Sequence, residues 1–143
     1  MHPSILDDLG LVAALREETK ALQDRLHIVA SFAAEDPPPY FPKSSSLALY
    51  RISQEAFNNI TRHACASEVN VELVVTEGTV RLRIEDDGVG FDTTQLQPGG
   101  LGIASLEERA RLAGGRLIIR AAPSQGVMIV AELPAAAPKR EAL

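Results

Sequence analysis

The sequence predicts an α+β fold, a two-layer α/β sandwich in which three helices cover one face of a mixed, mostly antiparallel sheet. The first observation behind this prediction is the order of the expected elements: helix, strand, helix, strand, strand, helix, strand, strand. The second is that two pairs of consecutive strands are joined by short turns, which makes each pair antiparallel and excludes a doubly wound parallel sheet. The third is that helices are inserted between the strands, which favours a sheet covered on one face.

The N-terminal part of the chain supplies a helix, a strand and a rigid connection. HPSILDD is expected to be extended, and over residues 9–26 apolar residues recur at helical spacing with charges between them. LHIVASFAA, rich in β-branched and apolar residues, predicts a strand. The following DPPPYFPK contains four prolines, which neither a helix nor a central strand tolerates, so it is expected to be a stiff surface connection.

The rest of the chain predicts two helices and four strands. A helix begins after residues 44–46, three serines whose hydroxyls could cap it, and continues to His63 with apolar residues three and four apart. A hairpin with its turn near Gly78 follows. A third helix is expected over residues 103–113, stopped by a Gly-Gly pair. The expected strands of this part are 68–75, 79–86, 116–122 and 127–134, and residues 135–143 form a frayed tail.

The composition indicates a single soluble domain. With 143 residues, of which 45% are hydrophobic and 23% charged, the chain is long enough for one core. The net charge of −5, with no basic run, argues against nucleic acid as a partner. No apolar run approaches the ~18 residues of a membrane span, and the acidic start differs from a signal peptide. A lone Cys65 suits a reducing compartment, so we expect a cytoplasmic protein without direct membrane contact.

Two polar side chains lie one turn apart on the second expected helix. In QEAFNNITRHA, Glu55 and Asn59 are four residues apart and project from the same face, which is not the apolar face. A carboxylate beside a carboxamide is a suitable hard-oxygen arrangement for Mg²⁺, which keeps waters and substrate phosphates among its ligands. The alternative is a solvated stripe on the helix, and this pair alone favours the stripe.

The stretch RLRIEDDGVGFD alternates like a strand and then places acids and glycines where the strand ends. One interpretation is a simple hairpin turn, because an Asp-Gly pair after an alternating run is a strong hairpin signal. The other is a ligand site, in which a buried Asp86 accepts a hydrogen bond from an exocyclic amine such as that of adenine. Gly88 and Gly90 would then let a planar base come close to the backbone.

The stretch PGGLGIASLEERA leads from glycines directly into a helix. Free backbone N–H groups at the positive end of a helix dipole bind anions. A single glycine-rich helix start is weak support for such a site, because many of them are only turns.

Together these stretches resemble a known family. QEAFNNITRHA, EDDGVGFD and GGLGIASLEERARLAGG, in this order and spacing, resemble the GHKL superfamily of DNA gyrase, heat-shock chaperones, mismatch-repair proteins and histidine kinases. The chain is most similar to sensor histidine kinases of the nitrate/nitrite-sensor type, which carry an LYRIxQEAxxNxxRHA helix and a GGxGLxxMxERxxxLGG lid segment. HPSILDDLGLVAAL also resembles the stretch that follows the dimerisation helices of those kinases. The resemblance covers residues 2–134.

The resemblance implies a Bergerat-type ATP-binding catalytic domain and a role for each motif residue. Asp86 would bind the adenine amine, and Gly88 and Gly90 would shape that pocket. Asn59 would hold Mg²⁺ between the phosphates. Glu55 stands where ATP-hydrolysing relatives keep the catalytic acid that orients water. The implied domain spans residues 9–134, between a segment of residues 1–8 that follows the absent dimerisation helices and the flexible tail of residues 135–143.

The resemblance also implies phosphate contacts and a lid. Gly100, Leu101 and Gly102 would line the phosphates beneath a mobile lid of about residues 93–101. Arg62 and His63 would lie near the phosphates or the base.

Two departures from the family pattern affect the expected function. Domains of this type usually have a Gly-Thr pair entering the last strand, whose hydroxyl helps a water beside the adenine aspartate. Here Val127 follows Gly126, so weaker base recognition is expected. In addition, none of the three histidines of the chain is followed by an acid on a helix, as a phosphoacceptor histidine would be. The phosphoacceptor is therefore expected on another domain.

The function implied by the resemblance is that of a protein histidine kinase catalytic fragment. It would bind Mg-ATP and donate the γ-phosphate to a histidine on its own histidine-phosphotransfer and dimerisation domain, for relay to a response regulator. The parent protein would be a homodimer and this chain alone a monomer. One alternative is a stand-alone GHKL serine kinase that acts as an anti-sigma factor, which the stretch HPSILDDLGLVAAL disfavours. The other is a nucleotide-binding module without catalysis, which only Val127 favours.

Overall fold

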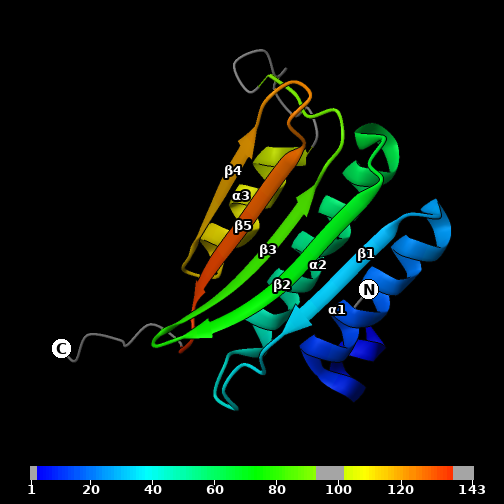
Figure 1. The fold of residues 1–143 in the computed structure, drawn as a ribbon. Coiled ribbons are helices and arrows are strands. Elements are labelled where there is room, and N and C mark those ends of the chain that lie inside the picture. Colours follow the sequence, from blue (N-terminus) through cyan, green and yellow to red (C-terminus); the bar gives the residue numbers. More distant parts are fainter. Residues whose placement is uncertain (1–2, 93–101, 137–143) are drawn as a thin grey trace.

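The computed structural model of the protein describes residues 3–92 and 102–136, which form one layer of helices against one sheet (Figure 1). Three parts of the chain thus lie outside the described residues: residues 1–2, the segment predicted to be the lid and most of the predicted tail. The elements in chain order are α1 (Ser4–Leu26), β1 (Val29–Ala34), α2 (Lys43–Asn59), the π-helical turn η1 (Ile60–Ala64), β2 (Glu68–Thr76), β3 (Thr79–Asp86), α3 (Ile103–Leu112), β4 (Arg116–Ala121) and β5 (Val127–Pro134).

The sheet has five strands in the order β1-β2-β3-β5-β4. β1 pairs with β2 in parallel, and the other three pairings are antiparallel. The parallel pair is possible because α2 forms the crossover between β1 and β2, whereas the tight turn at Gly78 joins β2 to β3. The predicted α+β fold with a mixed, mostly antiparallel sheet is confirmed.

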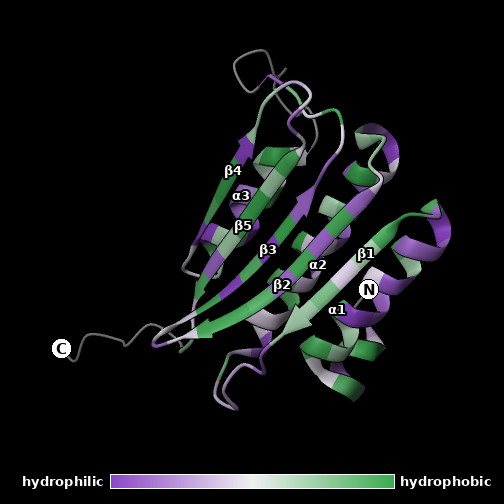
Figure 2. Cartoon of the chain, viewed as in Figure 1, coloured by the Kyte–Doolittle hydropathy of each residue, from purple (hydrophilic) through white to green (hydrophobic). Residues whose placement is uncertain are grey.

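The central strands alternate between a buried and a solvated side, as their sequence pattern predicts. In β3, Val80, Leu82 and Ile84 are almost fully buried, whereas the residues between them are at least partly exposed. The same alternation of hydropathy is visible along β2 (Figure 2). Because side chains of a strand point alternately to the two faces, the buried set faces one layer only.

The three helices cover that buried face and complete the core (Figure 1). α2 lies over the middle of the sheet, in contact with β3 and β5, while α1 packs beside it on β1 and α3 on β4 and β5. Each helix contributes fully buried apolar side chains, which include Leu15 and Leu22 of α1, Leu49, Ile52 and Phe57 of α2, and Leu106 of α3. The core is aliphatic apart from Phe57, Tyr50 and Phe41.

The N-terminal stretch differs from the prediction. Residues 4–8 were expected to be extended, but they are helical and form the first part of α1. Gly10, with φ 86° and ψ 173°, breaks the helix into two pieces, a conformation that glycine adopts without steric cost. Leu6 is buried in the core, so the short first piece is held by packing rather than by its own propensity, which is why the local pattern did not reveal it.

The ends of α2 also differ in detail from the prediction. The serines at 44–46 do not cap the helix, because it already begins at Lys43 and its N-cap residue is Pro42. The Pro42 carbonyl accepts the N–H groups of Ser45 and Ser46, each at 3.0 Å. The predicted extension to His63 is confirmed, but its last residues form the π-helical turn η1. Cys65, the single cysteine of the chain, follows this turn in a left-handed conformation and is exposed.

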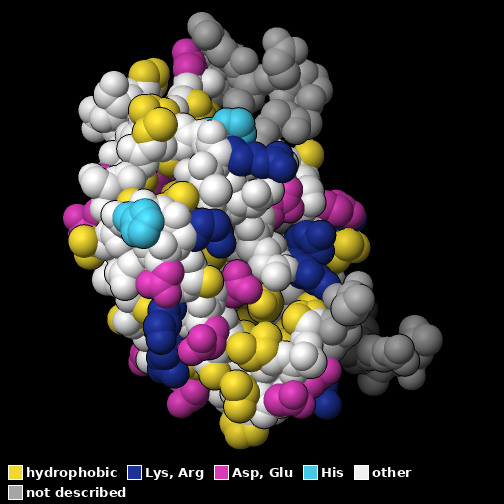
Figure 3. Space-filling view, turned by 90° about the vertical axis from the view of Figure 1, so that its right-hand side faces the viewer, with side chains coloured by type: hydrophobic (Ala, Val, Ile, Leu, Met, Phe, Trp, Pro, Cys, Tyr) yellow, Lys and Arg dark blue, Asp and Glu magenta, His cyan; other side chains and the backbone are white. Residues whose placement is uncertain are grey.

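The remaining predicted boundaries agree with the structure to within one residue, with two exceptions: β1 begins at Val29 rather than at Leu26, and Ala135, predicted to start the tail, is buried in the core. α3 ends at Leu112, and the N–H groups of Gly114 and Gly115 bond back to its last carbonyls, as expected for a glycine stop. On the side of the molecule that carries α1, acidic and basic side chains are interspersed (Figure 3). Within the described part of the chain, no helix combines the length and the apolar character needed to cross a bilayer.

Candidate functional site

A pocket opens at the end of the sheet where β3 stops and β4 and β5 are joined. It lies between η1, the start of α3 and the ends of these strands. Its walls are apolar, and its polar side chains are Asn59, His63 and Asp86. The apolar lining includes Ile84, Ile119, Val127 and Ile129 from the strands, Ile60 and Ala64 from η1, and Ile103 and Leu106 from α3.

Asp86 occupies a position that the strand pattern reserves for an apolar residue. It continues the buried row of Val80, Leu82 and Ile84 and is only 7% exposed. Its carboxylate accepts the Gly88 N–H at 2.8 Å and the Val127 N–H. Burial raises the pKa of Asp86, and these two backbone donors oppose that rise. The result is a desolvated carboxyl group at the base of an apolar pocket, with acceptor capacity left for a ligand donor.

Gly88 and Gly90 shape the pocket through contacts with the protein's own backbone. A Cβ at Gly88 would lie 2.1 Å from the Ala64 carbonyl oxygen. At Gly90, which has φ +64°, it would lie 2.0 Å from the Ala122 carbonyl oxygen. Only Gly90 of the two lines the pocket. The absence of a side chain at both positions therefore lets the strand-end loop fit between η1 and the β4–β5 turn.

The polar residues at the end of α2 and in the π-helical turn η1 differ in whether they line the pocket. Asn59 and His63 both line the pocket, one at the end of α2 and one within η1. Arg62, which was expected near the phosphates or the base, is exposed and does not line the pocket. π-Turns inside helices are frequent at functional sites, because they change which side chains face a given direction.

Glu55 lies outside the apolar pocket, against the start of α3. The Ser105 hydroxyl donates to Glu55 Oε2 at 3.2 Å, and a Cβ at Gly102 would lie 2.0 Å from Glu55 Oε1. Gly102 is the N-cap of α3, has φ +65°, and is followed by a first turn without an acidic residue of its own. Glu55 thus places a negative charge at the positive end of α3. Gly100 and Leu101, the other expected phosphate contacts, lie outside the described residues.

A second, wider groove runs on the other side of Glu55, between the three helices. Its lining includes Arg25, Arg51 and Arg109 together with Glu55 and Asn58. The stripe formed by Glu55 and Asn59 therefore separates an apolar pocket from a polar groove. It is not merely a solvated surface, because Asn59 faces the pocket and Glu55 packs on Gly102.

The residues that sequence reasoning missed are those that hold the strand-end loop. Asp87, Ser67 and Ala64 contact the loop or each other through hydrogen bonds of 2.8–2.9 Å. Ser124 donates its N–H to the Val89 carbonyl at 2.6 Å. The one available signal was the second acid of the Asp-Asp pair, because aspartate is a frequent acceptor for backbone N–H groups at turns.

The donor set allows a magnesium ion only with help from a ligand. Within the described residues, no group of three or more His, Cys, Asp or Glu side chains could hold a metal ion. The amide oxygen of Asn59 is a hard donor of the kind Mg²⁺ accepts beside phosphate oxygens and waters. The residues present therefore fit an ion that arrives with a phosphorylated ligand rather than one held by the protein alone.

Comparisons with known proteins agree with this site. Residues 44–137 match the family described as histidine kinase-, DNA gyrase B-, and HSP90-like ATPase. The chain belongs to this family. It is 34% identical to the signal transduction histidine-protein kinase/phosphatase DegS of Brevibacillus brevis, over 90% of this chain and 33% of that protein. It is 35% identical to the sensor histidine kinase MctS of Rhizobium johnstonii, over 96% of this chain and 30% of that protein.

The fold also matches a solved structure of a histidine kinase domain. The histidine kinase domain of the Erythrobacter litoralis EL346 blue-light activated histidine kinase superposes with a TM-score of 0.72 at 19% identity, covering 87% of this chain and 61% of that one. At this identity the likeness shows the fold alone. The resemblance to the catalytic domain of sensor histidine kinases is confirmed by the family match and the curated relatives. This chain spans about a third of the length of those relatives.

Proposed function

We propose that this chain is the ATP-binding catalytic domain of a two-component sensor histidine kinase. The observation that carries the proposal is Asp86, a buried carboxyl group in the core row of β3 that faces an apolar pocket. A carboxyl group in this position raises the free energy of the folded state unless a ligand compensates its desolvation. An adenine base would do so, because its exocyclic amine donates to Asp86 while its ring contacts the apolar walls.

The same arrangement selects the base. A 6-oxo purine presents an oxygen where adenine presents an amine, and two acceptors facing each other in a buried site repel. The side chains of Ile84, Val127 and Ile129 offer no hydrogen-bond donor. The preference for adenine over a 6-oxo purine would therefore depend on Asp86. His63, which lines the pocket, would contact the base or the sugar.

The phosphates would leave the pocket towards the start of α3, past Asn59. Asn59 would hold a Mg²⁺ ion through its amide oxygen, and the ion would supply positive charge to the phosphates. Gly102 would offer its backbone to the phosphates, together with Gly100 and Leu101.

The catalytic step of the proposal moves the γ-phosphoryl group from ATP to an imidazole nitrogen of a histidine on a separate dimerisation domain, with ADP released. Phosphoryl transfer depends mainly on position and charge neutralisation, which suits the few polar groups present here. Glu55 lies at the boundary between the pocket and the polar groove, where an acceptor side chain would approach. We expect a response regulator as the next acceptor, a dimeric parent protein and a cytoplasmic location for this domain.

Calorimetric titration of ATP, with and without Mg²⁺, tests this proposal. We expect the parent chain to bind ATP and to bind it more tightly with Mg²⁺. Asp86→Asn should weaken ATP binding by about 100-fold or more, because the buried carboxylate becomes an amide that turns a donor towards the amine. Asn59→Ala should remove the effect of Mg²⁺ and leave the metal-free affinity unchanged.

Three results would contradict these assignments. Absence of ATP binding at millimolar concentration would reject the proposed function. Unchanged ATP binding by Asp86→Asn would move the base site elsewhere. An unchanged Mg²⁺ effect in Asn59→Ala would move the metal site.

A further inference from the structure

The loop after β3 is tied to the start of β2 by one side chain, Asp87. Its Oδ1 accepts the Ser67 N–H at 2.8 Å and the Glu68 N–H at 2.9 Å, and its Oδ2 accepts the Ser67 hydroxyl at 2.8 Å. In return the Asp87 N–H donates to the Glu68 carbonyl at 3.2 Å. Three of the roughly four acceptor positions of this exposed carboxylate are therefore occupied by donors of the protein.

The charge of Asp87 is stabilised by these same contacts. Hydrogen bonds from the Glu68 and Ser67 groups lower the pKa of Asp87. The neighbouring Asp86, one residue earlier, shows the opposite direction, because burial raises its pKa. The two adjacent acids therefore have different roles, one facing the pocket and the other facing the backbone of β2.

Two further ties fix the loop from its other sides. The Val89 N–H donates to the Ala64 carbonyl at 2.8 Å, and the Val89 carbonyl accepts the Ser124 N–H at 2.6 Å. Ala64 itself lines the pocket. The loop is thus held by β2, by η1 and by the β4–β5 turn.

These contacts lie beyond the last residue pair of the β2–β3 ladder. The β2–β3 ladder ends at the pair Val69 and Asp86, so the backbone of Asp87 is not part of it. What the Asp87 contacts determine is the path of the chain immediately after Asp86. This path places the Gly88 N–H 2.8 Å from Asp86 Oδ1, where it directs the carboxylate.

We propose that Asp87 is a positioning residue for nucleotide recognition. It fixes the loop whose Gly88 N–H orients the Asp86 carboxylate towards the base, and it acts through hydrogen-bond geometry rather than through its charge. The proposal rests on the proposed ATP-binding function for its effect on affinity, whereas its effect on the loop can be measured without nucleotide.

Two substitutions distinguish the effect of the Asp87 hydrogen bonds from the effect of its negative charge. Asp87→Asn keeps an oxygen that can accept the two backbone N–H groups but removes the charge, whereas Asp87→Ala removes both. Glu85→Gln is the matched control, because Glu85 also places a negative charge near Asp86 but makes its contact with Arg83. The variants are compared in calorimetric titrations of ATP and of inosine triphosphate, whose 6-oxo group cannot donate to Asp86.

We expect Asp87→Ala to weaken ATP binding by about tenfold and to bring the affinities for ATP and inosine triphosphate closer together. Asp87→Asn should stay within about threefold of the parent, and Glu85→Gln should match it. If Asp87→Ala weakened the binding of ATP and of inosine triphosphate by the same factor, Asp87 would have a structural role only. Parental ATP affinity in Asp87→Ala, or equal loss in Asp87→Asn and Asp87→Ala, would overturn the proposal.

Amide hydrogen exchange without nucleotide provides the independent readout. The Gly88 and Val89 amides should exchange at least about tenfold faster in Asp87→Ala, and at nearly the parental rate in Asp87→Asn and Glu85→Gln. Unchanged exchange in Asp87→Ala would reject the positioning role even if the parent binds ATP. If the parent does not bind ATP, the proposed ATP-binding function is rejected. The amide exchange rates still show whether Asp87 holds the loop.

Discussion

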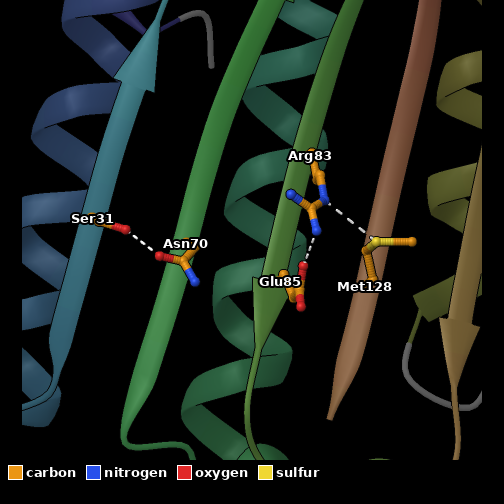
Figure 4. A network of polar contacts seen from close by, with 5 residues as sticks. All are labelled: Ser31, Asn70, Arg83, Glu85 and Met128. Atoms are coloured by element: carbon orange, nitrogen blue, oxygen red, sulfur yellow. Dashed lines mark hydrogen bonds and ion pairs between the residues drawn. The ribbon is translucent and has the colours of Figure 1, made fainter. Parts of the chain in front are cut away.

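Charged side chains on the two faces of the sheet have different partners. On the open face, Glu132 of β5 pairs with Arg81 at 3.3 Å and with Arg116 at 3.0 Å. Nearby on the same face, Arg83 contacts Glu85 and Met128, and Ser31 contacts Asn70 (Figure 4). On the covered face, Asp86 is the one charged side chain in the buried row of β3, and its partners are backbone N–H groups.

The charged side chains on the open face affect the free energy of folding little, whereas the buried Asp86 carboxyl group destabilises the folded state. Solvent-exposed ion pairs contribute about 0–1 kcal/mol each, so their residues can be exchanged with little effect. A buried carboxyl group loses its hydration and must be compensated by fixed donors. We therefore expect the pocket end of the sheet to be sensitive to small changes and the open face to tolerate them.

The largest effect is expected for Gly88→Ala. Its Cβ would lie 2.1 Å from the Ala64 carbonyl oxygen, so the loop and η1 must separate. We expect a loss of about 1–3 kcal/mol in the free energy of unfolding, measured by urea denaturation, and weaker ATP binding. Gly78→Ala is the control, because that glycine lies at the far end of the same hairpin with no atom within 4 Å of a Cβ. Gly78→Ala should strain its turn but leave ATP affinity unchanged, and equal ATP affinity in both variants would contradict the packing argument.

The second test measures the cost of burying Asp86. Because burial raises the pKa of Asp86 above its usual 3.8, the folded state binds this proton more tightly than the unfolded state. The contribution of Asp86 to stability therefore falls as the pH rises from 3.8 to its folded-state pKa, and is constant above it. Nucleotide affinity should rise over the same interval, since the ionised form accepts the amine. A ¹³C titration of the Asp86 carboxyl group checks the direction, and a midpoint at or below 3.8 would refute it.

A smaller effect is expected for Val127→Thr. Val127 is half-buried, lines the pocket and lies opposite Asp86 in the β3–β5 register. A hydroxyl at this nearly isosteric position adds a polar partner beside the carboxylate, and we expect about two- to tenfold tighter ATP binding. Val127→Ala, which lacks the hydroxyl, should not improve binding. Equal affinities of the parent and Val127→Thr would show that the missing hydroxyl does not limit base recognition.

The smallest effect is expected for Glu132→Gln on the open face. It removes the acidic partner of both Arg81 and Arg116, whose side chains are 49% and 70% exposed. The free energy of unfolding should change by less than about 1 kcal/mol, and ATP affinity should not change. A loss comparable with that of Gly88→Ala would remove the contrast between the two faces.

The part of the fold that local patterns determine could be predicted from the sequence. The β2–β3 hairpin follows from alternation and a turn glycine, and Asp86 could be placed in the buried row because it continues the Val80, Leu82, Ile84 series. The helical start of α1 could not, because it depends on burying Leu6 in a core assembled from distant segments. The outward position of Arg62 depends on the π-helical turn, which has no periodicity signal of its own.

The candidate site, too, could be predicted from the sequence only in part. The motif residues Asp86, Asn59 and His63 converge on one pocket, as the resemblance implied. The role of Gly88 was assigned to the approach of a base, whereas its close neighbour is the Ala64 backbone. Contacts between segments far apart in the chain cannot be inferred from spacing within one segment. For the same reason, the contacts of Asp87 with Ser67 and Glu68 became apparent only in the structure.

The exposed Cys65 gives this molecule a built-in attachment point for a reporter dye. It is the single cysteine of the chain, and it directly follows Ala64, which lines the pocket. A maleimide fluorophore would therefore couple at one defined place beside the proposed nucleotide site without any substitution. Changes in its emission would follow ligand entry in real time, so that association and dissociation rates could be obtained for the parent and for every variant described above.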